Sequence, residues 1–181
     1  MSKIVFKKLQ AILERIPDEL EGKEVHVGWL GNINEENGTP VSYVATIQEY
    51  GDPSHSIPPR PMLEPTMRNN HEAYLKFLKL AAKRVQDKQV SGDDALHELG
   101  ERVTADIVKT IYSITSPALS PITLMLRKMK DKNPDLKVSG KVVGEAAAKV
   151  AKNESYSGVS TKPLVESETM VNAVTHEVVK K

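Results

Sequence analysis

The sequence predicts an α+β fold, with a small antiparallel or mixed sheet, four to five helices and one long central helix. Apolar residues recur at three- and four-residue steps over 93–115, which is the spacing of one helical face. Two stretches near the ends of the chain, 23–30 and 173–179, instead show the two-residue alternation that is typical of strands. We expect these two strands to lie side by side.

Other helices are predicted by apolar periodicity and by residues that favour helix ends. They are expected over 3–16, 41–50, 62–87 and 121–132, with an Ala-rich helix over 141–152 and a helical turn at 166–172. Gly51 stands where a helix C-cap favours a residue that tolerates positive φ. Ser91 or Asp93 is the expected N-cap of the long helix, and Ser120 that of the helix that starts at Pro121.

Composition predicts a single globular domain over 1–181. A chain of this length can bury a core, and 39% hydrophobic with 27% charged residues argues against wholesale disorder. The chain has no cysteine, which excludes disulfides, thiolate metal ligands and a cysteine nucleophile. No apolar run approaches the roughly 20 residues that cross a bilayer, and residues 1–10 are too amphipathic for a secretory signal. We therefore expect a soluble protein made in the cytoplasm, without a membrane partner.

Residues 51–61 contain four prolines, which predict a stiff, exposed and extended arm between two helices. Each proline restricts its own φ and biases the preceding residue away from the helical region. Such an arm suits docking better than catalysis. Arg60, between two of the prolines, would lose little entropy on making a bidentate contact with a carboxylate. The alternative is a surface arginine that lies over an aromatic ring.

Residues 133–162 carry few core-forming positions apart from the Ala-rich stretch. We interpret them as a flexible insertion that orders against a partner.

Charge is unevenly distributed although the net charge is only +1, which excludes a global field that attracts nucleic acid. Acidic residues dominate over 14–49 and basic residues over 127–152. Two interpretations remain open: two solvated faces, or a heterologous contact in which the acidic side of one subunit meets the basic side of the next and closes a ring.

Candidate catalytic and metal-binding groups are few. His97 and Glu101 share a helix face at a spacing that can hold a metal, but no third ligand is evident. His55 follows Ser54, yet adjacent residues rarely present a nucleophile and a base in attack geometry. The chain has no phosphate-binding glycine loop, and the basic run over 127–152 lacks interleaved aromatics. We expect no cofactor, no metal site and no catalytic residues.

Three stretches resemble the tail-completion (neck, minor tail protein Z-like) family of tailed DNA bacteriophages. In YVATIQEYGDPSHSIPPRPMLEPTM (43–67), an apolar helix ends in E-Y-G and is followed by I-P-P-R-P-M. LHELGERVTADIVKTIYSITSPALSPITL (96–124) is similar to the family's long helix and its Pro/Ser turn, and KPLVESETMVNAVTHEVV (162–179) is similar to its closing block. The three stretches stand in the family's order.

The resemblance implies a non-enzymatic structural virion protein, assembled in the bacterial host cytoplasm. It would sit at the head-proximal end of the tail, complete the tail and support head–tail joining. Copies would form a homo-oligomeric, hexameric ring in the virion, through which DNA passes without sequence-specific binding. Its partners would be the tail terminator, head–tail connector and tail tube proteins. The residues implied in these contacts are Tyr50, Ile57, Pro58, Pro59, Arg60, Pro61, Met170 and Asn172.

Two alternative functions remain open. The first is a tail terminator protein that caps the tail tube. The second is a small phage-encoded enzyme, such as a hydrolase that uses His97, or a DNA-binding regulator.

Overall fold

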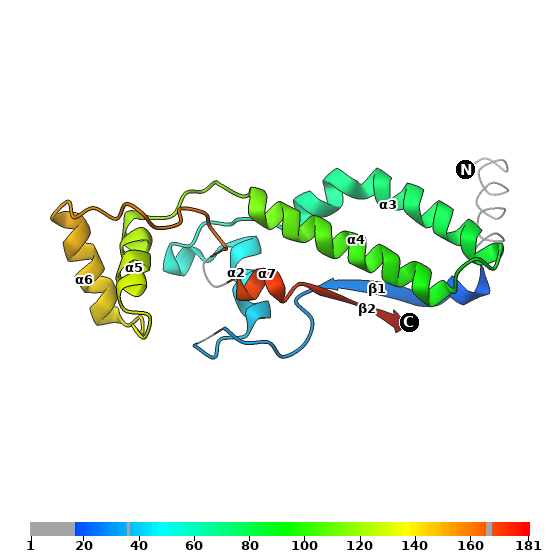
Figure 1. Cartoon of the computed structure of the whole chain (residues 1–181), viewed down its shortest axis with the longest axis horizontal. Coiled ribbons are helices and arrows are strands. Elements are labelled where there is room, and N and C mark those ends of the chain that lie inside the picture. Colours follow the sequence, from blue (N-terminus) through cyan, green and yellow to red (C-terminus); the bar gives the residue numbers. More distant parts are fainter. Residues whose placement is uncertain (1–16, 36, 166–167) are drawn as a thin grey trace.

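The computed structural model describes residues 17–35, 37–165 and 168–181, so the helix expected over 3–16 lies outside the described residues. These residues form six α-helices and a two-stranded antiparallel sheet, which confirms the α+β prediction with a long central helix. The molecule is elongated (Figure 1). The long antiparallel helices α3 (Leu63–Gln86) and α4 (Gly92–Ser113) lie toward one end, and α5 (Pro121–Lys132) and α6 (Gly140–Ala151) lie at the other.

The sheet joins the two ends of the described chain, as the sequence predicts. Strand β1 (Lys23–Gly28) pairs antiparallel with β2 (Thr175–Lys180), with Val25 opposite Val178. Both strands pack against α4 (Figure 1). Helices α2 (Val41–Tyr50) and α7 (Thr169–Asn172) pack against each other between the sheet and the α5–α6 pair.

The predicted helix ends are confirmed. Gly51 ends α2 with φ of 78°, and a Cβ there would lie 2.9 Å from the Ile57 carbonyl oxygen. Of the two candidate caps of α4, Ser91 is the one used, because its Oγ accepts a hydrogen bond from Asp94 N at 3.1 Å. Ser120 caps α5 in the same way, through Thr123 N at 3.1 Å.

One main hydrophobic core holds the central part of the molecule together. Ile107 and Ile111 of α4 are fully buried in it. Their buried partners come from α2, from α3 and its N-cap, from α7 and from the two residues between α7 and β2: Val41, Ala45, Met62, Tyr74, Met170, Val171, Ala173 and Val174. A smaller cluster of Ala81, Val85 and Ala95 packs with Leu20 where α3 turns into α4. Residues far apart in sequence therefore share one core.

Residues 133–162, predicted as a flexible insertion, contain α6 within the computed structure. Helix α6 packs on α5 through Ala146, which is fully buried. Its N-terminus is capped by Ser139, and residues 153–163 then lead back toward α7. The two helices form a hairpin set apart from the main core (Figure 1).

A single carboxylate connects α2 to α3. Glu49 is 8% exposed, and its Oε2 accepts hydrogen bonds from Met62 N at 2.5 Å and Leu63 N at 3.0 Å. Its Oε1 accepts a third from Glu64 N at 3.2 Å. The first turn of a helix leaves N–H groups unpaired at the positive end of the helix dipole. Met62, at the N-cap of α3, has no side chain that can accept these hydrogen bonds. Glu49 of α2 therefore caps α3 in its place.

Replacing this carboxylate should destabilise the whole domain. Glu49→Ala leaves three N–H groups at the start of α3 without an acceptor, so we expect a loss of about 2–3 kcal/mol in the free energy of unfolding. Urea denaturation followed by circular dichroism measures it. Glu64→Ala is the control, because Glu64 makes only an exposed ion pair with Arg68 and its loss should cost less than about 0.5 kcal/mol. Equal losses in the two variants would contradict the capping role.

Helix α4 approaches the sheet closely at Gly100, where a Cβ would overlap Cγ and Cδ2 of the His176 ring. We expect Gly100→Ala to destabilise the protein by about 1–3 kcal/mol despite the better helix propensity of alanine. Gly144, inside α6, has open space where a Cβ would stand. Gly144→Ala should therefore stabilise the protein by about 0.5–1 kcal/mol. Thermal unfolding of the two variants should shift in opposite directions.

Candidate functional site

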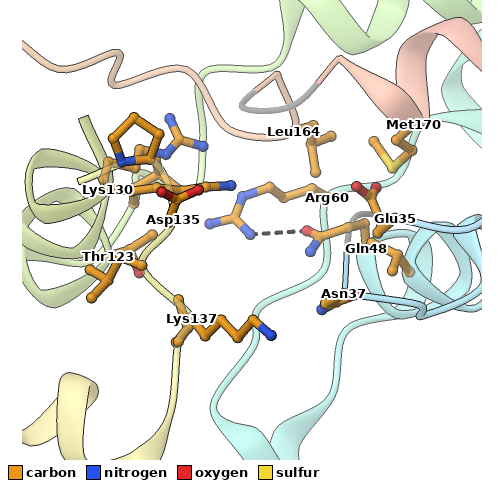
Figure 2. A pocket seen from close by; sticks show the side chains of 16 residues that line it. Glu35, Asn37, Gln48, Arg60, Thr123, Lys130, Asp135, Lys137, Leu164 and Met170 are labelled. Atoms are coloured by element: carbon orange, nitrogen blue, oxygen red, sulfur yellow. Dashed lines mark hydrogen bonds between the residues drawn. The ribbon is translucent and has the colours of Figure 1, made fainter. Parts of the chain in front are cut away.

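A pocket lies between the α5–α6 hairpin and the body of the molecule (Figure 2). Its volume is about 930 Å³. Helix α5 and the loop that follows it form one wall, and α2, the end of the arm and the start of α7 form the other. The pocket thus lies where the proline arm, the α4–α5 connection and the C-terminal block meet.

The pocket combines basic groups with apolar walls. Its cationic side chains are Arg60, Arg127, Lys130 and Lys137. Among the described lining residues they outnumber the acidic ones, Glu35 and Asp135, so this part of the lining carries a formal net charge of +2. The apolar lining comes from Val44, Leu119, Leu136, Val138, Leu164 and Met170. An anionic ligand with apolar neighbours would match this composition.

The sequence predicts Arg60 as a docking residue on an exposed arm, but the folded chain buries it. It is only 6% exposed, and its Nε donates a hydrogen bond to the Pro117 carbonyl oxygen at 3.0 Å. Its Nη1 donates to Gln48 Oε1 at 3.2 Å (Figure 2). The backbone N of Arg60 also donates to the Gln48 carbonyl oxygen at 2.6 Å, which draws this part of the arm onto α2. The arginine therefore ties α2 to the α4–α5 connection within one chain.

Arg127 is a second buried arginine beside the pocket. Its Nη1 donates to the carbonyl oxygens of Ser160 at 2.7 Å and Lys162 at 2.9 Å, and so holds the returning segment against α5. Burial and the nearby positive charge of Arg127 both lower the pKa of Arg60 from its ordinary value. Two like charges close together favour an anion between them. Sequence analysis assigned Arg127 only to a basic run, since burial is not visible in the sequence.

The other implied contact residues divide into exposed and buried ones. Tyr50 is 77% exposed, and Pro58, Pro59, Pro61 and Asn172 are also exposed. Ile57 is partly buried and Met170 is buried, and the Met170 carbonyl oxygen accepts a hydrogen bond from Trp29 Nε1 at 2.7 Å. The side chains of Met170 and Arg60 lie on the pocket, whereas the exposed prolines do not line it.

The arm is extended over only part of its expected length. Residues Pro53–His55 form a short 3₁₀ helix, and Asp52 and Ile57 pair across it as an isolated bridge. Residues 58–61, which follow this turn, belong to no helix or strand. The Asp52 side chain accepts from Ser54 N and so favours a turn over a straight arm.

The turn brings Asp52, Ser54 and His55 together, but not as a catalytic triad. His55 Nδ1 lies 2.6 Å from Asp52 Oδ2 and 3.1 Å from Ser54 Oγ. In a triad the histidine uses one ring nitrogen for the serine and the other for the acid. Here both partners meet Nδ1, and the Ser54 hydroxyl donates instead to Asp52 Oδ1 at 2.5 Å. The arrangement is that of a hydrogen-bonded turn.

His97 lies across from a histidine of β2. Its Nδ1 is 3.2 Å from His176 Nε2, and the two rings meet edge to face. Within 17–35, 37–165 and 168–181, no three His, Cys, Asp or Glu side chains are grouped so that they could hold a metal ion. In the same ranges, no helix is both long and apolar enough to cross a membrane.

Comparison of the chain with protein-family models, with curated proteins and with solved structures yields no match. Function must therefore be argued from the residues and geometry of this chain.

The pH response of the arm can be predicted from Asp52. Hydrogen bonds from Ser54 and His55 lower the pKa of this carboxyl from 3.8 to about 2. A lowered pKa means that the charged form stabilises the turn above pH 3.8 and that this contribution is lost as the pH falls toward 2. Ser54→Ala removes the strongest donor, so the pKa of Asp52 should rise toward 3.8 in a carboxyl ¹³C NMR titration. Ser42→Ala, on the exposed face of α2, should leave it unchanged; a pKa near 2 in Ser54→Ala would contradict this assignment.

Proposed function

We propose that this chain is a structural protein at the head-proximal end of a bacteriophage tail, where it completes the tail and supports head–tail joining. The observation that carries the proposal is that the three stretches of the resemblance build one core. Ala45 and Met62 come from 43–67, and Ile107 and Ile111 come from 96–124. The stretch 162–179 contributes the buried residues Met170, Val171, Ala173 and Val174.

Polar contacts join the same stretches. Arg60 of the first stretch binds the Pro117 carbonyl oxygen of the second, and Thr66 Oγ1 donates to Thr110 Oγ1 at 2.6 Å. The proposal requires these contacts, because three stretches that belong to one family fold must come together in the folded chain. Their convergence therefore supports a reading of all three as parts of one structural unit.

A ring of identical copies is the form in which we expect the protein to act. The short 3₁₀ helix Asp18–Leu20 packs where α3 turns into α4, and Asp18, Glu19 and the following Glu21 are exposed. Helices α5 and α6 lie at the other end of the elongated molecule (Figure 1). Exposed lysines of the second end include Lys132, Lys137, Lys141 and Lys152. A contact between unlike ends of neighbouring copies is heterologous and closes a ring when the rotation permits. In the virion this ring would surround the DNA channel, with six copies matching the tail.

The exposed part of the arm offers a surface for a neighbouring subunit, the tail terminator or the connector. Tyr50 projects at its base, followed by exposed Pro58, Pro59 and Pro61. Tyrosines are enriched among residues that dominate binding energy at interfaces, and a stiff backbone loses little entropy on docking. We assign the joining contact to this exposed surface and no longer to Arg60, which is buried.

The proposal predicts the phenotype of a phage in which this gene carries an early amber codon. Electron microscopy of particles from a non-suppressing host should show DNA-filled heads beside separate tails of normal length. Wild-type protein supplied in trans should restore joined, infectious particles. Protein with Tyr50→Ala should fold normally but restore infectivity poorly, whereas Leu80→Ala, an exposed apolar residue of α3, should restore it fully.

Other outcomes assign other functions. Overlong tail tubes would show a tail terminator that caps the tube. Intact, infectious virions without the protein would refute a structural role in the tail and return the enzyme and regulator alternatives to consideration.

A further inference from the structure

Arg60 is a buried cation whose hydrogen bonds are incomplete. The guanidinium group carries five N–H bonds that can donate. Within the described residues, Nε donates to a backbone carbonyl oxygen and Nη1 donates to a side-chain amide oxygen. Both partners are neutral. Among the described residues, no carboxylate accepts a hydrogen bond from the Arg60 side chain. A buried charge of this kind is costly unless an opposite charge reaches it.

The free end of the guanidinium faces the pocket. Figure 2 shows the Arg60 fork reaching into the space between the two walls, with only one of its terminal nitrogens bonded to Gln48. Lys137 stands at the rim of the same space and is exposed. Arg60 Nη2 and Lys137 are therefore positioned to bind an anion that enters from solvent. A hydrogen bond from Nη2 to this anion would supply the acceptor that the guanidinium lacks.

The size and walls of the pocket favour a peptide over a small free anion. A volume of about 930 Å³ far exceeds what one phosphate or acetate ion fills. Apolar side chains stand on both walls, Val44 and Met170 on one and Leu119, Leu136 and Val138 on the other. Val138 is 60% exposed in the isolated chain, and its burial on binding would add to affinity. An acidic side chain with apolar neighbours uses both features of the pocket.

We propose that this pocket is a docking site for an acidic, partly apolar peptide segment of a partner protein, whose carboxylate binds the free end of the Arg60 guanidinium. The segment lies between α5 and α2 and bridges the hairpin to the body of the molecule. The site rests on the chemistry of the pocket alone, and it stands whether or not the protein belongs to a phage tail. Within a tail it would be a second contact, distinct from the exposed surface around Tyr50.

A pair of short peptides tests the site in the full-length protein. The probes are acetyl-Ala-Leu-Glu-Leu-Ala-amide and its isosteric Gln counterpart, titrated into ¹⁵N-labelled protein at constant salt. The Glu peptide should bind at least about tenfold more tightly, the ratio that a difference of 1.4 kcal/mol produces. Its binding should shift the resonances of the Arg60 Nε–H, the Gln48 side-chain amide and the Val138 backbone amide.

Variants separate the pocket from general charge attraction. Arg60→Gln should abolish the preference for the Glu peptide, and Lys137→Gln, at an exposed rim position that does not support the fold, should reduce it. Lys141→Gln removes an equal charge from α6 outside the pocket and should leave the preference unchanged.

Three results would overturn the proposal. The first is equal binding of the Glu and Gln peptides, and the second is no binding of either at millimolar concentration. The third is inorganic phosphate that shifts the same resonances while the Glu peptide does not, which would identify a site for a free anion. None of these results bears on the amber-mutant phenotype, so the two proposals fail separately.

Discussion

Helix α4 organises the main core, because it packs against α3 and against both strands of the sheet. Its buried residues Ile107 and Ile111 share one core cluster with buried side chains of α2, α3, α7 and the segment that precedes β2. Farther toward its N-terminus the sheet lies against it so closely that only glycine fits at position 100. A hydrophobic face of this length can organise short elements that would be unstable alone, since a two-stranded sheet and a four-residue helix have little stability of their own.

One carboxylate and one guanidinium group join the elements around this core. Glu49 carries the negative charge that the start of α3 requires, and Arg60 links α2 to the α4–α5 connection. The two groups differ in how completely they are satisfied. Glu49 has three N–H donors, whereas Arg60 has only neutral acceptors and a second arginine near it. A buried cation that is left in this state marks a place where binding, not folding, supplies the missing partner.

The residues that the sequence offers as candidate catalytic or metal-binding groups have structural roles in the folded chain. His55 and Ser54 serve a turn that bends the arm, and His97 faces His176 across the contact of α4 with β2. Two features have no evident role in the fold: the exposed Tyr50 with its neighbouring prolines, and the basic pocket. Both are suited to contacts with other proteins, which agrees with the assembly role that we propose.

Local sequence signals define most elements of the described chain, because helix and strand periodicity, Ser91, Ser120 and Gly51 act over a few residues. The alternation of both terminal stretches also indicates that the two strands pair. The pocket, in contrast, forms only through tertiary contacts. Arg60 is far along the chain from Arg127 and Lys137, and the burial of an arginine depends on which segments fold over it. The turn within the arm likewise came from the side-chain bonds of Asp52, which compete with the extended preference of the prolines.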